Sequence, residues 1–192
     1  MRAGPPNAGA LGAAFLAMRV MQAISLLTVI GLSANFVSEA VNANYKPPNA
    51  MIGTLVVTVI GTIYIFINYV LYRDGSLPAL ISAAADFLVM IATLVVAVIV
   101  GLPVSYLKCP RYPSGGHTAM FLDSVYENVK KTGRGNYIWV NPDKVACYEI
   151  KSIWGLSIAL CVLFAVSSIL CVCIWRSERA KAGPKTADSD SE

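Results

Sequence analysis

Two charged side chains, Arg19 and Asp86, lie inside the most apolar stretches of the 192-residue sequence. A charge at the centre of a membrane costs about 2.5 to 3.5 kcal/mol on insertion scales, so each side chain needs a partner or a functional reason. Measured from the same membrane face, both fall at a depth of about 9 Å. The sequence therefore predicts that they pair, with Gln22 completing the hydrogen bonds.

Two other interpretations of these charges stay open. Arg19 could snorkel to the lipid headgroups while Asp86 is protonated or faces the interface. The two charges could instead belong to an ion or proton pathway, although such a relay usually needs several ionisable groups across the membrane. A separation above about 6 Å between the guanidinium and the carboxylate would remove the pairing hypothesis.

The five cysteines show no metal-binding or redox spacing. Cys109 and Cys147 lie in the longest polar segment and are a candidate disulfide, with two unpaired thiols as the alternative. Cys171 and Cys173 shortly precede Arg176 at the end of the last apolar block, a usual setting for palmitoylation. Small hydrophobic packing residues are the competing interpretation of this second pair.

The other reactive residue types suggest no reaction. His117 follows two glycines and has no second candidate metal ligand. The sequence contains no nucleophile-base pair and no glycine-rich phosphate loop, so catalysis lacks its parts. We therefore expect no catalytic residue, no metal and no cofactor, and the protein is not expected to be an enzyme. A net charge of +4 is too modest to argue for nucleic acid as a partner.

The elements that position these residues are four apolar blocks. Apolar residues make up 56% of the chain and charged residues only 14%, against about 25% charged in a soluble domain. At about 1.5 Å per residue each block is long enough to cross a hydrocarbon core of about 30 Å as a helix. The sequence predicts an all-α membrane protein, a four-transmembrane-helix antiparallel bundle over residues 13–176. The predicted spans are residues 13–36, 51–72, 80–102 and 152–175.

The polar segments lie between and beyond these blocks. Residues 103–151 form the one large loop, expected to be extracytoplasmic, and the apolar residues of 118–131 recur at the spacing of one helical face. Residues 136–140 could be a strand or an aromatic-rich loop. Residues 1–12 are expected to be a cytosolic N-terminal segment, and 177–192 a disordered cytosolic tail.

Small residues mark candidate helix contacts, because close backbone approach drives packing in lipid. Gly53 and Gly61 lie two turns apart in the second block, and Gly155 and Ala159 form a small-xxx-small pair in the fourth. The alternative is that such residues are common in any transmembrane helix. Ala85, Ala92 and Gly101 recur along the third block.

The orientation rests on the distribution of basic residues. The two sides carry similar numbers of Lys and Arg, but Arg176, Arg179 and Lys181 follow the last block within six residues. This concentration favours cytosolic N- and C-termini. Cys109 and Cys147 then face an oxidising space, where a disulfide can form.

The first block reads RVMQAISLLTVIGLSAN from Arg19 to Asn35. Together with a short first loop, a tight turn at Arg73, an early acidic residue in the third block and a basic stretch after the fourth, it resembles the fungal branch of the MARVEL-domain family. The resemblance covers about residues 13–180. It implies a four-helix bundle with cytosolic termini, no catalysis, and a role in membrane apposition, lateral organisation or vesicle traffic. The loop 103–151 is longer than a minimal member requires.

Two other tetraspan families fit less well. Claudins have their large ectodomain between the first two helices, where this chain has only a short loop. Tetraspanins place it between the third and fourth helices, as here, but with a Cys-Cys-Gly motif and more cysteines.

The leading functional hypothesis is a non-enzymatic scaffold that organises lipids or other integral membrane proteins, in the plasma membrane or a related compartment. A homo-oligomer is compatible with this role. The second hypothesis is a small channel or transporter subunit that oligomerises around a pore lined by Asp86 and nearby polar positions such as Thr93. The third is an accessory subunit of a larger membrane complex.

Overall fold

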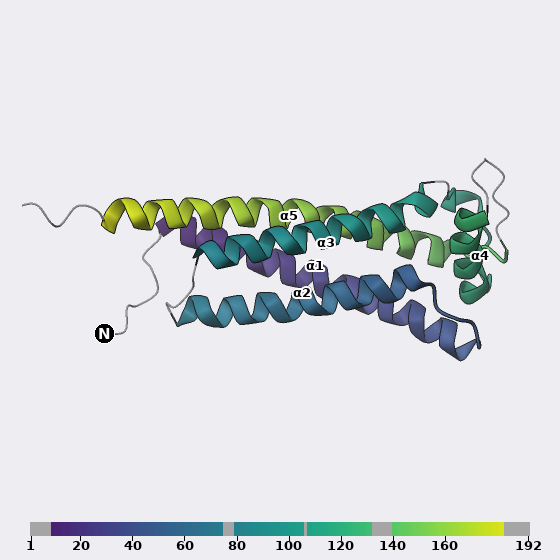
Figure 1. Cartoon of the computed structure of the whole chain (residues 1–192). Helices are drawn as coiled ribbons and strands as arrows, with labels where there is room; N and C mark the ends of the chain where they lie inside the picture. Colours follow the sequence, from purple (N-terminus) through teal and green to yellow (C-terminus); the bar gives the residue numbers. More distant parts are fainter. Residues whose placement is uncertain (1–8, 75–78, 106, 132–139, 183–192) are drawn as a thin grey trace, which may run out of the picture.

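The computed structural model describes residues 9–74, 79–105, 107–131 and 140–182. Within these ranges every element is helical, and four long helices run antiparallel while a short one crosses one end of the bundle (Figure 1). The predicted all-α, four-helix class is therefore confirmed. The elements are α1 (Gly9–Asn42), α2 (Asn49–Arg73), α3 (Ala79–Val104), η1 (Cys109–Arg111), α4 (Thr118–Lys131) and α5 (Lys144–Ala182).

The outer surface of the bundle is apolar. Each long helix contains a stretch with a mean hydropathy between 1.8 and 2.8, long enough to cross a membrane. Large side chains such as Phe66, Ile81 and Leu88 are more than 60% exposed. An apolar surface this extensive is rare on a soluble monomer, whereas lipid accommodates it. The protein is an integral membrane protein.

The inner face of each long helix follows a heptad-like spacing. Buried positions on α1 and α5 alternate at intervals of three and four residues, the period that lets helices pack knobs-into-holes along a shallow left-handed crossing. On α1 these are Phe15, Arg19, Gln22, Leu26, Val29, Ser33, Phe36 and Ala40, and on α5 they are Ile150, Ile153, Ser157, Leu160, Phe164, Ser167 and Cys171.

The helices do not contact one another equally. α3 packs against α5 over most of its length, and α1 packs against both α2 and α5. The contact between α2 and α3 is much shorter, and in Figure 1 these two helices diverge towards the end that α4 covers. The bundle is therefore closed at the end near the termini and wider at the α4 end.

The region between α3 and α5 extends the core of the bundle. Phe121, Leu122 and Val125 on α4 are buried against the bundle end, which agrees with the amphipathic helix predicted for 118–131. A disulfide joins Cys109 in η1 to Cys147 in α5, with the two Cα atoms 5.6 Å apart. The loop is thus attached covalently to the first turns of α5.

The first and last helices of the chain, α1 and α5, are longer than the predicted spans. α5 begins at Lys144 rather than at 152, because the Asp143 carboxylate accepts a hydrogen bond from the Ala146 backbone and caps the helix start. α1 continues to Asn42 instead of ending at 36.

The prediction that the disordered tail starts at 177 was wrong for its first residues, since α5 continues to Ala182. The Arg179 guanidinium stacks 4.5 Å from the Trp175 ring centroid, and a cation near a helix C-terminus is favourable. Residues 183–192, residues 1–8 and most of 136–140 lie outside the described residues.

Candidate functional site

The structure places Arg19 and Asp86 in direct contact. Arg19 Nη1 lies 2.7 Å from Asp86 Oδ1, and Nη2 donates to Oδ2 at 2.9 Å. Two parallel N–H···O bonds of this kind are the strongest geometry available to a carboxylate. Their side chains are only 3% and 0% exposed, so Arg19 turns inward and does not reach the headgroups.

Gln22 joins the pair as the sequence suggested. Its side-chain oxygen accepts a hydrogen bond of 3.1 Å from Arg19 Nη1. Its amide nitrogen donates to the Leu163 backbone carbonyl on α5, also at 3.1 Å. Gln22 therefore ties the ion pair of α1 and α3 to a third helix.

Four further polar residues complete what we call the polar cluster. Asp86 also accepts hydrogen bonds from the Tyr64 hydroxyl on α2 at 2.8 Å and from the Ser167 hydroxyl on α5 at 2.7 Å. The Ser82 hydroxyl accepts from Arg19 Nη2 at 3.2 Å and donates to Asn68 Oδ1 at 2.6 Å. The polar cluster therefore comprises Arg19, Gln22, Tyr64, Asn68, Ser82, Asp86 and Ser167, drawn from all four long helices.

Aromatic rings cover the guanidinium. The Arg19 Cζ atom lies 4.8 Å from the centroid of Phe15 and 5.5 Å from that of Tyr64, within the range of cation–π attraction. Arg19 Nε is buried and has no hydrogen-bond partner among the described residues. The rings and the carboxylate thus replace the hydration of the two NH2 groups, whereas the Nε–H has no acceptor among the described residues.

The sequence signal for Tyr64, Asn68, Ser82 and Ser167 was weak but present. Uncharged polar residues insert into a membrane at modest cost and do not interrupt an apolar block. Asn68, Ser82 and Ser167 occupy buried positions, and Asn68 and Ser167 belong to the three- and four-residue series of their helices. A search for polar residues in that series would have added Asn68 and Ser167 to the predicted site.

The polar cluster satisfies its charges internally. Each Asp86 oxygen accepts two of the hydrogen bonds described above, and both guanidinium NH2 groups donate. The side chains of Arg19, Gln22 and Asp86 are buried. No group of three metal-ligating side chains occurs among the described residues. The arrangement joins the four long helices.

The small residues predicted as helix contacts divide into two groups. A Cβ on Gly61 would lie 3.4 Å from the Leu26 side chain, so Gly61 does lie between α2 and α1. Gly53 and Gly155 have nothing within 4 Å, and Ala159 is exposed. As contacts within the bundle these three predictions were wrong, because the residues fall outside the buried heptad series and face lipid.

The cysteines take three different environments. Cys109 and Cys147 are bonded and buried. Cys171 is buried beside the polar cluster, its Sγ 3.9 Å from Asp86 Oδ2, which agrees with the packing interpretation and leaves its thiol inaccessible to palmitoylation. Cys173 is exposed and remains a candidate acceptor.

Comparison with known proteins finds no protein family, no curated protein and no solved structure that matches this chain.

Proposed function

We propose that the protein is a non-enzymatic membrane scaffold that organises lipids or partner membrane proteins laterally. The observation that supports this most is the closure of the polar cluster. Its two membrane-embedded charges neutralise each other at 3% and 0% exposure and bond to all four helices. The polar groups inside the bundle serve its assembly, which leaves the outer surface as the functional surface.

The same contacts argue against a pore within one chain. The Thr93 hydroxyl, the other expected pore-lining group, donates back to its own helix at the Val89 and Met90 carbonyls, 3.0 and 2.9 Å away. A pathway for ions needs polar groups that face water or the ion. Both Asp86 and Thr93 are buried, and their hydrogen bonds are made within the bundle.

The proposed setting is the plasma membrane, with both termini in the cytosol. The start of α1 and the end of α5, which adjoin the termini, lie at the end of the bundle opposite to the disulfide (Figure 1). Disulfides persist in oxidising compartments and are rare in the cytosol, which supports an extracytoplasmic loop. The resemblance of the helix 1 pattern to fungal MARVEL-domain proteins implies the same topology and role.

The test separates the scaffold from the channel. Purified full chain is reconstituted into liposomes loaded with potassium- and pH-sensitive dyes, and the same chain fused to a biotin ligase at its C-terminus labels neighbours in cells. A scaffold gives flux equal to that of protein-free vesicles and a reproducible set of labelled membrane proteins. Flux that Asp86→Asn abolishes, while the lipid-facing control Thr28→Val retains it, would establish the channel instead.

A further inference from the structure

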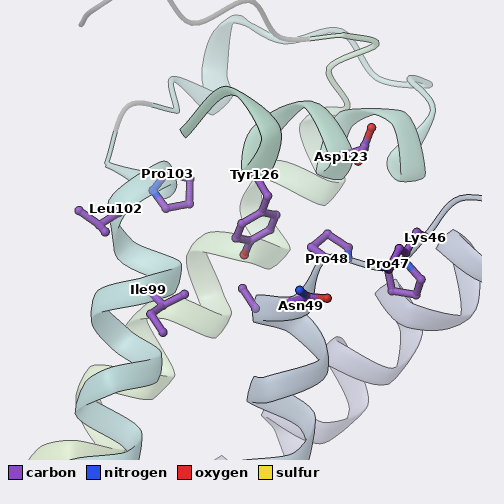
Figure 2. Close-up of a pocket in the computed structure, with 10 residues that line it drawn as sticks. Lys46, Pro47, Pro48, Asn49, Ile99, Leu102, Pro103, Asp123 and Tyr126 are labelled. Atoms are coloured by element: carbon purple, nitrogen blue, oxygen red, sulfur yellow. The ribbon is translucent and has the colours of Figure 1, made fainter. Parts of the chain in front are cut away.

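A cavity of about 630 Å³ lies where α2 and α3 diverge beneath α4. Ile99, Leu102 and Pro103 of α3 form one wall and the start of α2 at Asn49 forms the other (Figure 2). Its volume falls within the range of about 300 to 1,000 Å³ that is typical of small-molecule sites. The cavity lies at the level where the spans end, so one side meets the lipid and the other meets the polar loop.

One buried hydroxyl at this cavity lacks a hydrogen bond. The Tyr126 hydroxyl is shielded from water and has no partner among the described residues, and Figure 2 shows it pointing from α4 into the space between Ile99 and Asn49. Burial raises the pKa of Tyr126, so the phenol stays protonated and can donate. Buried hydroxyls are rarely left without a partner, which indicates that something else supplies the acceptor.

The rim of the cavity carries charges of both signs. Lys46, which precedes the two prolines at the start of α2, and Asp123 on α4 both line it and are both exposed. A ligand with an anion for the ammonium, a cation for the carboxylate, an acceptor for the Tyr126 hydroxyl and an apolar portion for the α3 wall would complement all of these groups.

We propose that this cavity binds one zwitterionic glycerophospholipid. The phosphate meets Lys46, the headgroup ammonium meets Asp123, an ester carbonyl accepts the hydrogen bond from Tyr126, and an acyl chain lies along Ile99 and Leu102. The site would hold a lipid at the interface between the bundle and its loop. The inference requires only that the protein is in a membrane, and it does not depend on the scaffold function.

Native mass spectrometry of the full chain, titrated in detergent with dioleoylphosphatidylethanolamine, tests the proposal. One saturable copy is expected for the unaltered protein. Tyr126→Phe removes the donor alone and should weaken this binding about 5- to 10-fold. Tyr148→Phe changes an exposed tyrosine near the start of α5 and should leave the binding unchanged.

A second variant separates headgroup recognition from simple contact with lipid. Lys46→Gln alters an exposed side chain outside the core, so folding is preserved, and it should weaken binding of the phospholipid about 5- to 10-fold. Binding of dioleoylglycerol, which has the same esters and no headgroup, should not respond to it. Formation of the Cys109–Cys147 disulfide and a single elution peak establish that each variant is folded.

Three results would overturn the proposal. The first is a graded series of bound lipids with no saturable first copy, which is the behaviour of lipid around any membrane protein. The second is unchanged phospholipid binding in both Tyr126→Phe and Lys46→Gln. The third is a sterol that displaces the phospholipid at equal concentration.

Discussion

The buried pair of Arg19 and Asp86 determines which helices contact one another and how they are placed along the bundle axis. A buried ion pair loses hydration, and replacing it with apolar side chains of similar size is often neutral or stabilising. Its benefit here is geometric, because the Asp86 oxygens accept hydrogen bonds from α1, α2 and α5 at distances of 2.7 to 2.9 Å. A shift of α1 by one turn would break two of these bonds, a shift of α2 or α5 would break one, and a shift of α3 would break all four.

Removing one member of the pair should therefore lower the free energy of unfolding more than removing both. Arg19→Leu is expected to lower the free energy of unfolding by about 3 to 5 kcal/mol, because it leaves Asp86 buried without its partner. The double variant Arg19→Leu/Asp86→Leu should be more stable than either single variant by about 2 kcal/mol or more. Unfolding by SDS titration in bicelles measures all three.

Thr28→Leu provides the control for this cycle, because Thr28 lies on the exposed face of α1. It should change the free energy of unfolding by less than about 0.5 kcal/mol. Additive losses in the double variant would contradict the coupling, since independent sites add while coupled partners do not.

Charge was the residue property that the sequence made visible. Arg19 and Asp86 could be matched by depth alone because each stood out in an apolar block, and Gln22 lies one helical turn from Arg19. The Tyr64 hydroxyl contributes an equally short bond to Asp86, yet Tyr64 lies outside the buried three- and four-residue series of α2. Only the rotation of α2 about its axis, which the packed bundle determines, reveals it.

At the scale of the helix, the contact between α3 and α5 depends on one glycine. A Cβ on Gly101 would lie 2.5 Å from the Trp154 indole nitrogen, closer than real contacts allow. The indole therefore lies directly against the α3 backbone, and this permits the long contact between these two helices.

Gly101→Ala should lower the free energy of unfolding by about 1 to 3 kcal/mol, because the methyl group displaces a packed ring. Gly155→Ala is the matched control in the neighbouring helix, where nothing lies within 4 Å, and alanine's better helix propensity should leave stability equal or raise it by up to about 1 kcal/mol. Thermal unfolding followed by circular dichroism measures both. Equal changes in the free energy of unfolding at the two positions would show that the Trp154 contact does not determine the result.

The number of spans was predictable because hydropathy measures the property that the membrane selects. The short helix over 118–131 was predictable too, since its amphipathic period matches the face it buries. It was not predictable which small residues make contacts, because Gly61 and Gly53 look alike in sequence and differ only in the direction they face in the bundle. The helical extension of α5 beyond the membrane was also missed, because it depends on the Asp143 cap more than on hydropathy.

The disulfide attaches the loop to α5, and both cysteines belong to the hydrophobic core. Cys109 and Cys147 are 38 residues apart in the chain, so the chain-entropy model assigns the closed loop about 4 kcal/mol. Cys109→Ser/Cys147→Ser should lose about this much stability. Cys173→Ser, an exposed free cysteine, should lose almost none.

Hydrogen exchange locates the loss within the molecule. In the double serine variant, the amides of α4 and η1 should exchange faster, while those around the polar cluster should keep their protection, since the cluster lies towards the opposite end of the bundle. Faster exchange throughout the bundle would contradict this division and show that the disulfide supports all four spans.

For the molecule as a whole, the two ends of the bundle are held together by different means. Near the termini, a charged hydrogen-bond network joins all four helices. At the other end, α2 and α3 diverge, and a disulfide holds the loop together with apolar side chains that extend the core of the bundle. This asymmetry agrees with a reducing cytosol on the first side and an oxidising space on the second.

The proposed orientation can be tested with single cysteines. In a background where Cys161, Cys171 and Cys173 are replaced by alanine, Lys46→Cys and Asp74→Cys place one thiol at each end of the bundle, both at exposed positions. With cytosolic termini, a membrane-impermeant maleimide should label Lys46→Cys on intact cells and Asp74→Cys only after permeabilisation. The bonded pair Cys109–Cys147 does not react and needs no replacement. The reverse labelling pattern would place the disulfide in the cytosol, where it would not persist, and would contradict both the orientation and the oxidising environment assigned to the loop.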